Sequence, residues 1–399
     1  MFFKAPPLRS KALRRLRKYF PNWAKMLEYD ARQISDGVDE ATGVWNDDRA
    51  IVICGGLSFF LKSPLVRQEP KVWDFAVFGL AAISMYTNRT IRFDKPVSAS
   101  AARAIEKLNY IYRVWSLVSI SQPRLELANI VPDPVNFTPT LGKIICLSGG
   151  IDSTSAAICA KAETAYTHGL LIAGADYPSA DHAGFIELEK RVKANAKIIG
   201  LDVIVVETDF RKMPMDWGLQ HSFLLAMALH YHSASFEEAS YSIDSMPAHE
   251  LIQHPWGNCS ALLHAFSTDY LPFVTYGHLF SRSERARIIA DFDNALLPQI
   301  SVCWVDTSTG QNCGRCMKCQ RTRAVFNLIG ADTTTMFVND PGPLRVDDFK
   351  IPENYKARMD ASVVATWLEV TEKESGDYTL LKEHLVDLRR SYVRQMPYR

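Results

Sequence analysis

From residue 142 onward, short apolar runs alternate with longer runs in which apolar positions recur with helical period. The short runs predict strands at 143–147, 170–177, 202–207, 239–242 and 273–276, and the longer runs predict helices at 153–165, 183–199 and 219–231. Strands that alternate with helices favour a parallel sheet covered on both faces, with ligands bound at the carboxyl ends of the strands. The expected fold class is therefore α/β.

Residues 1–140 follow a different pattern and predict an additional N-terminal domain of mixed α/β structure. A basic, helix-prone segment comes first; strands are then expected at 50–60 and 90–93, and helices at 71–87 and 99–118. Prolines at 123, 132, 134 and 139 indicate a linker or an irregular edge. We hypothesise that this domain packs in part on the next one and binds a protein partner with the rest.

The second predicted domain covers residues 141–345 and contains all the chemistry that the sequence suggests. Residues 346–399 predict amphipathic helices and form an expected C-terminal helical extension. The sequence contains no internal repeat and no low-complexity tract.

The composition is ordinary for a soluble protein with a large core, since 47% of the 399 residues are hydrophobic and 22% are charged. A net charge of +1 gives no global steering toward nucleic acid or an acidic membrane. No apolar stretch approaches the ~20 residues that span a bilayer. The basic N-terminus lacks the apolar core of a secretory signal. We therefore expect a cytoplasmic protein with neither a membrane nor a nucleic acid as partner.

The sequence KIICLSGGIDS at residues 143–153 ends an apolar run at two glycines and continues into a predicted helix. Gly149 and Gly150 allow the backbone to turn tightly and to approach a phosphate closely. Ser148, Ser153 and the free N–H groups of the first helical turn can donate to phosphate oxygens. The order of residues differs from the Walker motif, which the chain lacks. The alternative is a glycine turn that binds no ligand.

Four of the eight cysteines gather near residue 310, whereas the other four stand singly in the sequence. Cys303, Cys313, Cys316 and Cys319 have the spacing of a structural zinc site, because two Cys-x2-Cys steps let one turn present three sulfurs. An iron–sulfur cluster uses similar spacing, but its common form ends in Cys-Pro and here a glutamine follows. A disulfide framework does not fit this bunching in so large a chain.

The Ser-Gly-Gly-x-Asp-Ser order at residues 148–153 resembles the PP-loop of ATP pyrophosphatases, which cleave ATP between its α and β phosphates. Together with the four cysteines it resembles the 7-cyano-7-deazaguanine synthase family of the queuosine pathway, over about residues 142–331. The resemblance implies a Rossmann-like domain of the HUP type, and ATP, Mg²⁺ and Zn²⁺ as cofactors. It also implies that ATP activates the carboxylate of 7-carboxy-7-deazaguanine before an amine attacks.

The resemblance assigns roles to particular residues. Asp152 and Ser153 would be catalytic, and the four cysteines would hold zinc. The nucleotide would be bound by Ser148, Gly149, Gly150, Asp152, Ser153, Ala173 and Asp176, with adenine against the end of the strand expected at 170–177. Asp152 would hold Mg²⁺ or orient the loop; alternatively it is an acid that stabilises the positive end of the helix dipole.

The candidates for substrate binding are Trp256, Arg282, Glu284, Arg285 and Arg321. Trp256 could stack on a purine-like ring, or it could anchor the core. Arg282, Glu284 and Arg285 could pair with the substrate carboxylate, or they could be ordinary charges at a helix N-terminus. Arg321 and Arg323 could face the substrate or simply solvate a helix. His182, His221 and His254 are expected to be structural.

The sequence departs from the family where Gln320-Arg321-Thr322-Arg323 follows the last cysteine and where Gln220-His221 replaces an Arg-Asn pair. These departures and the long N-terminal region resemble synthase-like proteins of bacterial anti-phage systems, in which a protein amine is thought to accept the deazaguanine. The alternatives are a synthase that uses ammonia, a PP-loop enzyme that modifies tRNA, and a non-catalytic nucleotide-binding scaffold. A homodimer is compatible with each.

Overall fold

A computed structural model describes residues 37–115, 121–134, 139–250, 256–303 and 308–338. The basic N-terminal segment, His254 and the predicted C-terminal helical extension lie outside the described residues.

The predicted parallel sheet is confirmed. Its strands are β8 (Lys143–Cys146), β9 (Tyr166–Ala173), β10 (Asp202–Thr208) and β11 (Glu238–Ser240), which pair in parallel in the order β11-β8-β9-β10. β9 begins earlier than expected and ends before Gly174. The strand expected at 273–276 contributes only an isolated bridge, between Ala239 and Phe273.

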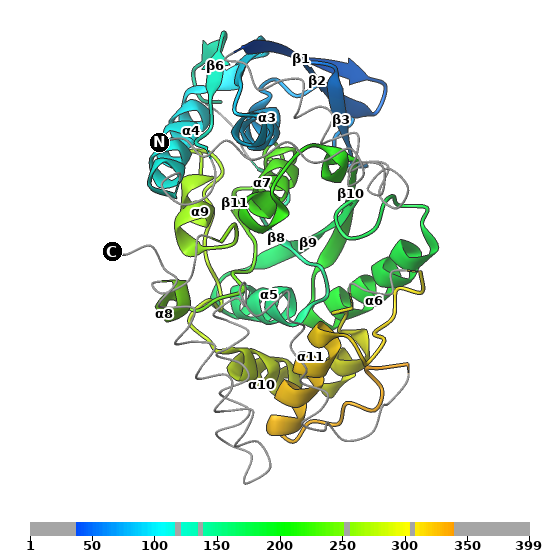
Figure 1. The fold of residues 1–399 in the computed structure, drawn as a ribbon. Helices are drawn as coiled ribbons and strands as arrows, with labels where there is room; N and C mark the ends of the chain where they lie inside the picture. The colour runs from blue at the N-terminus through cyan, green and yellow to red at the C-terminus, as the bar shows by residue number, and fades with distance from the viewer. Residues whose placement is uncertain (1–36, 116–120, 135–138, 251–255, 304–307, 339–399) are drawn as a thin grey trace, which may run out of the picture.

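Helices cover both faces of these strands, as the alternation predicts. Ile144 and Leu170 belong to one core, which includes α7 (Trp217–His230), whereas Ile145 and Leu171 belong to another with α5 (Ile151–Glu163) and α6 (Ala183–Ile199). Neighbouring residues of a strand point to opposite faces, so apolar runs without polar gaps are what a strand buried on both faces requires. Figure 1 shows α5 and α6 on one side of β8 and β9 and α7 on the other.

The strand expected at 50–60 is a hairpin of two strands, β2 (Arg49–Cys54) and β3 (Leu57–Lys62). Gly55 and Gly56 have φ of 52° and 86°, and two successive positive φ values make the type of two-residue turn that matches strand twist. The sequence analysis also missed β1 (Val38–Asn46), which pairs with β2.

The remaining elements before residue 135 surround this hairpin. They are α3 (Asp74–Thr87), β4 (Thr90–Phe93), α4 (Ala99–Trp115) and β6 (Leu125–Leu127), with β5 (Val97–Ser98) and β7 (Ile130–Val131) forming a separate pair. The helices and the strand β4 correspond closely to the predicted ranges.

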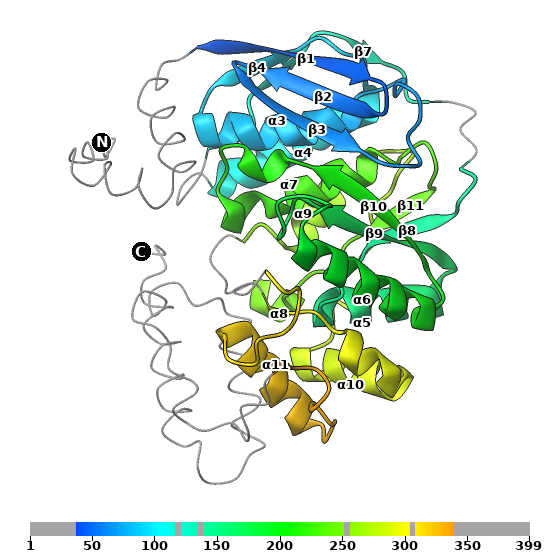
Figure 2. The ribbon, with the colours of Figure 1, turned by 90° about the vertical axis from the view of Figure 1, so that its right-hand side faces the viewer.

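One nine-stranded sheet crosses the boundary that was expected near residue 140. Its order is β11-β8-β9-β10-β3-β2-β1-β4-β6, and the junction is an antiparallel pairing of β10 with β3, in which Thr208 lies opposite Leu61. The core is continuous there as well, since α3 packs on α7 and the Phe59 ring meets Phe210 edge-on at 4.9 Å. Figures 1 and 2 show the strands curving around α3 and α7.

Two buried histidines of the α7 region make the fold sensitive to acid. His230 is stacked between Phe78 and Phe273, with ring centroids 4.6 and 5.1 Å away, and His232 lies between the Ala228 carbonyl and the Ser63 hydroxyl. Burial lowers the pKa of each from 6.5 to about 4.

We expect these two histidines to lower the free energy of unfolding by about 4 kcal/mol between pH 7 and pH 5, about 2 kcal/mol for each. The unfolded chain takes up protons near pH 6.5 and the folded chain only near pH 4, so stability is lost as pH falls below 6.5. Urea denaturation across this range measures the change. The His230→Gln variant should lose about 2 kcal/mol of the pH dependence, and a flat profile in the wild type would contradict the assignment.

Candidate functional site

The glycine loop, residues 148–150, joins β8 to α5 at the carboxyl edge of the sheet. Gly149 has φ of 76°, and a Cβ there would lie 3.0 Å from Val192. Gly150 begins α5, and no side chain caps this helix. The Ser148 and Ser153 hydroxyls lie 3.1 Å apart across the turn. The loop therefore combines two facing hydroxyls with the uncapped N-terminus of a helix, and such N-termini favour anions.

Asp152, in the first turn of α5, is held by two arginines from α10 (Arg282–Phe292), which packs against α5. Arg282 Nη2 donates to Asp152 Oδ2 at 2.8 Å, and Arg285 Nη1 donates to Oδ1 at 2.7 Å. Burial alone would raise the pKa of Asp152, but Arg282 and Arg285, helped by Arg321, outweigh it and hold that pKa below its usual range. The structure thus brings together two of the predicted substrate residues, although it places them on a carboxylate of the protein.

Glu284 occupies the helix N-terminus that the sequence analysis gave as the alternative to substrate binding. It lies in the first turn of α10, where its carboxylate accepts from the Ser281 N–H at 2.7 Å while the Ser281 hydroxyl caps the Glu284 N–H. This reciprocal pair is a capping box, which satisfies two N–H groups at the start of a helix. It supports α10 and hence the position of Arg282.

Trp256 lies beside the start of α7 rather than at Asp152. Its indole N–H donates to Asp244 at 3.0 Å, and its ring lies 5.4 Å from the His221 ring. Asp244 follows Ile243, whose carbonyl accepts from Arg285 at 2.7 Å. The loop after β11 therefore contacts Trp256 through Asp244 and Arg285 through Ile243.

Ala173 and Asp176 lie at the carboxyl end of β9, where the sequence places the adenine. Ala173 is buried and Asp176 is exposed. Gly174, between them, was not singled out from the sequence. It has φ of 103°, and a Cβ there would overlap the Thr208 carbonyl oxygen of β10. The pattern of a glycine directly after a buried strand is the signal that could have identified it.

The four predicted cysteines meet in one cluster, with all four sulfurs within 4.8 Å of one another. The Cys303–Cys316 and Cys313–Cys319 sulfur distances are both 3.9 Å. A tetrahedral zinc site with bonds of about 2.3 Å places its sulfurs about 3.8 Å apart, so the cluster fits zinc. Hydrogen bonding from Cys319 and its neighbours lowers the pKa of Cys316 to about 5, whereas the same contact raises the pKa of Cys319 and burial raises that of Cys313. The sulfur geometry therefore carries the zinc assignment.

The cluster is built around the N-terminus of α11 (Met317–Leu328), where Cys316 is the N-cap residue. Arg321 and Arg323 follow on the same helix and are 8% and 3% exposed, so neither merely solvates it. Cys303 comes from the segment after the 3-10 helix η2 (Asn294–Gln299).

Two buried polar residues near the cluster were missed by the sequence analysis. Asn312 donates to the Ile300 carbonyl at 2.7 Å and accepts from the Val302 N–H at 2.8 Å. Arg191, on α6, donates to the carbonyls of Pro298, Ile300 and Gly310. The position of Asn312 directly before Cys313 was the available signal for it; nothing in the sequence around Arg191 marks it.

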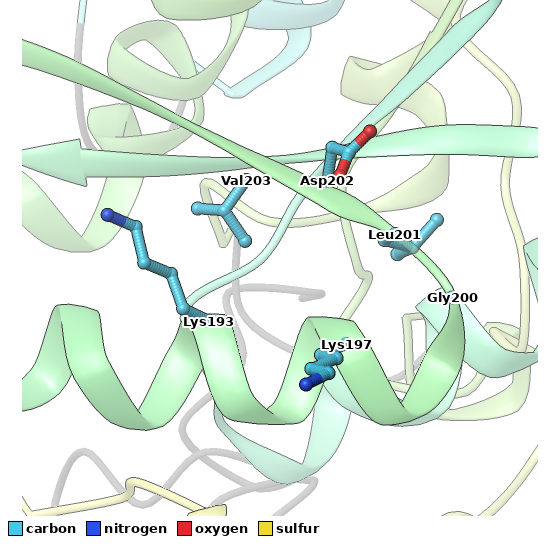
Figure 3. A pocket seen from close by; sticks show the side chains of 6 residues that line it. All are labelled: Lys193, Lys197, Gly200, Leu201, Asp202 and Val203. Atoms are coloured by element: carbon cyan, nitrogen blue, oxygen red, sulfur yellow. The ribbon is translucent and has the colours of Figure 1, made fainter.

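A hollow of about 530 Å³ lies elsewhere, between the end of α6 and the start of β10 (Figure 3). Its lining includes Lys193, Lys197 and Asp202, and Lys193 is paired with Glu189 at 2.5 Å. Because it opens at the amino end of β10, it lies at the edge of the sheet opposite the glycine loop. It contains none of the residues predicted to carry chemistry, and we assign it no role.

Within the described ranges, no helix combines the length and the apolar character needed to cross a membrane. The remaining short helices of the described residues are η1 (Phe210–Lys212), α8 (Pro247–Glu250) and α9 (Ser260–Ala265).

No protein-family model matches this sequence, and the search of curated proteins found no significantly similar one.

Proposed function

We propose that this protein is an ATP-dependent ligase that adenylates a carboxylate at the glycine loop and transfers the acyl group to an amine. The observation that carries the proposal is the loop itself: two glycines, two facing hydroxyls and an uncapped helix at the carboxyl end of a parallel strand. This is where ligands bind in such sheets, and helix N-termini favour phosphate.

Charge at the helix start supports the same conclusion. A lone Asp152 would repel a phosphate, but Arg282 and Arg285 lie on it, and one negative with two positive groups leaves a net charge of +1. Their side chains are only 10% and 3% exposed, so water screens this charge poorly. The two arginines therefore keep the mouth of the loop attractive to an anion.

Adenylation requires stabilisation of the negative charge on the phosphates more than it requires acid–base groups. One carboxylate oxygen attacks the α-phosphorus of ATP, the bond to the bridging oxygen breaks, and pyrophosphate leaves. An amine then attacks the acyl carbon, AMP leaves with the bonding electron pair, and the nitrogen loses a proton to solvent. Ser148, Ser153 and the N–H groups of α5 are suited to hold the phosphate oxygens as charge develops on them.

For the substrate we propose a 7-deazaguanine carboxylate such as 7-carboxy-7-deazaguanine, with a protein amine as acceptor in anti-phage defence. The resemblance of the sequence carries this part, and Trp256, whose ring lies 5.4 Å from that of His221, remains the candidate for stacking on a planar ring. Ammonia is the alternative acceptor.

The described residues fit one of the two expected metals, Zn²⁺, and not the other, Mg²⁺. Zinc fits the four sulfurs and, when bound, would supply a closed structural site with no position for substrate. Asp152, expected to hold Mg²⁺ or to orient the loop, has each carboxylate oxygen engaged by an arginine. The oxygen ligands at the loop therefore suit Mg²⁺ poorly, and no step of the proposed reaction depends on Mg²⁺ at Asp152.

The cysteines argue against sulfur transfer to tRNA. Four are gathered in the cluster, and burial raises the pKa of Cys54 and Cys259 to about 12 and raises those of Cys146 and Cys159 as well. Thiols with raised pKa values are poor nucleophiles at neutral pH.

Pyrophosphate release tests the proposal. With ATP and 7-carboxy-7-deazaguanine, the wild type should release pyrophosphate and AMP in equal amounts, and Ser153→Ala should lower kcat/KM roughly 100-fold. Ser155→Ala is the matched control, since its hydroxyl bonds only the Asp152 carbonyl of the same helix, at 3.1 Å. Asp152→Ala is less suitable, because it leaves two arginines without their anion and destabilises the fold. Absence of nucleotide binding in the zinc-loaded wild type would refute the proposal.

A further inference from the structure

One segment of backbone touches both the glycine loop and the cysteine cluster. This connecting segment, residues 300–303, follows η2 and ends at Cys303. On one side the Ser301 N–H donates to the Gly149 carbonyl at 2.8 Å. On the other side the Val302 and Cys303 N–H groups donate to Asn312 Oδ1 at 2.8 and 3.2 Å.

Asn312 uses its whole amide to hold this arrangement. Besides accepting from Val302 and Cys303, its Nδ2 donates to the carbonyls of Ile300 and Met336 at 2.7 and 2.9 Å. The residue is 1% exposed, so an unmade bond there would cost the full desolvation of a buried polar group. An amide is the side chain that can both donate twice and accept twice at one point.

Arg191 also holds the connecting segment. Its guanidinium donates to the Ile300 carbonyl, to Pro298 at 3.2 Å and to Gly310 at 3.1 Å. The Ile300 carbonyl is thus shared by Arg191 and Asn312, and the next residue is the one bonded to the glycine loop. Displacement of residue 300 must therefore move the partner of Gly149.

We infer that Asn312 is a positioning residue that couples order at the cysteine cluster to the conformation of the glycine loop. It lies beside Cys313 and bonds to Cys303, so binding of both sulfurs by one metal fixes the asparagine between them. Only the expected effect on ATP binding rests on the proposed function. The mechanical coupling stands on the contacts alone.

Hydrogen exchange in the full chain tests this coupling without reliance on activity. In zinc-loaded protein, Asn312→Asp keeps the acceptor but removes both donors and sets a charge against two carbonyls. We expect zinc to be released about 10-fold faster or more, and amides of residues 147–153 to exchange about 10-fold faster or more. Asn327→Ala is the matched control, because this exposed asparagine of α11 makes only a 3.4 Å contact with Thr333.

A second variant separates the two ends of the connection. Ser301→Pro removes the N–H that bonds Gly149, and Ile300 has φ of −66° and ψ of 126°, which a residue before proline readily adopts. This variant should speed exchange at 147–153 and leave zinc release unchanged. Chelation of zinc from the wild type should reproduce the effect of Asn312→Asp, and it does not depend on any variant folding.

Amides of α7 serve as the internal reference, since that helix belongs to the other core. If chelation or Asn312→Asp speeds exchange equally in α7 and in the glycine loop, or leaves the loop unchanged, the coupling is refuted. If the loop responds selectively but zinc-loaded wild type fails to bind ATP, the proposed function fails and the coupling stands. If ATP binds, its Kd should rise in both variants and remain unchanged in Asn327→Ala.

Discussion

Gly174→Ala is expected to destabilise the protein by more than about 4 kcal/mol, a large fraction of the roughly 5–15 kcal/mol that keeps an ordinary domain folded. The residue has φ of 103°, and the new Cβ would overlap the Thr208 carbonyl oxygen. Neither backbone can move away freely, because β9 and β10 pair directly before this point, with Ala173 opposite Glu207. Soluble yield and urea denaturation measure the effect.

Gly56→Ala is the control for backbone strain without collision. Gly56 also has positive φ, 86°, but a Cβ there would meet nothing within 4 Å. Its cost should be about 1 kcal/mol, the penalty for a left-handed residue with a side chain. If Gly174→Ala lowers the free energy of unfolding no more than Gly56→Ala does, then Gly174 does not lie as close to the Thr208 carbonyl as described.

Cys316→Ser is expected to abolish high-affinity zinc binding. The wild type should retain one zinc ion per chain after dialysis, because four sulfurs within 4.8 Å form a complete tetrahedral site. Structural zinc sites contribute about 10–16 kcal/mol of binding energy to folding, so loss of one ligand should also lower the thermal midpoint substantially. Metal analysis and thermal denaturation measure the two effects.

Cys159→Ser provides the comparison, since Cys159 lies on α5 outside the cluster. It should keep the zinc ion. Equal loss of zinc from both variants, or an iron–sulfur chromophore in the purified wild type, would overturn the zinc assignment.

The parts that the sequence predicted are those with a local cause. The cysteine cluster follows from spacing within seventeen residues, and β8 and α5 follow from an apolar run that ends in two glycines. Glu284 also has a local cause. The sequence left a substrate role and a helix N-terminus open for it, and Ser281 three residues earlier is the residue that marks the capping box.

The parts that the sequence did not predict depend on residues that are far apart in the chain. Arg282 and Arg285 reach Asp152 across 130 and 133 residues, and this pairing decides how the carboxylate can act. The pairing of Leu61 with Thr208 likewise leaves no periodic trace in either segment. Asn312 looks like any polar loop residue until its four partners are known.

The junction between β3 and β10 determines what shortened versions of this protein can reveal. A fragment that begins near residue 141 would leave β10 as an open border with unpaired backbone groups, and such borders promote aggregation. Its failure to capture a protein partner would then reflect damage to the fragment. Substitutions at exposed positions of β1 and β2, such as Val44 and Ile53, can instead test whether residues 1–140 bind a protein partner, because they leave the sheet intact.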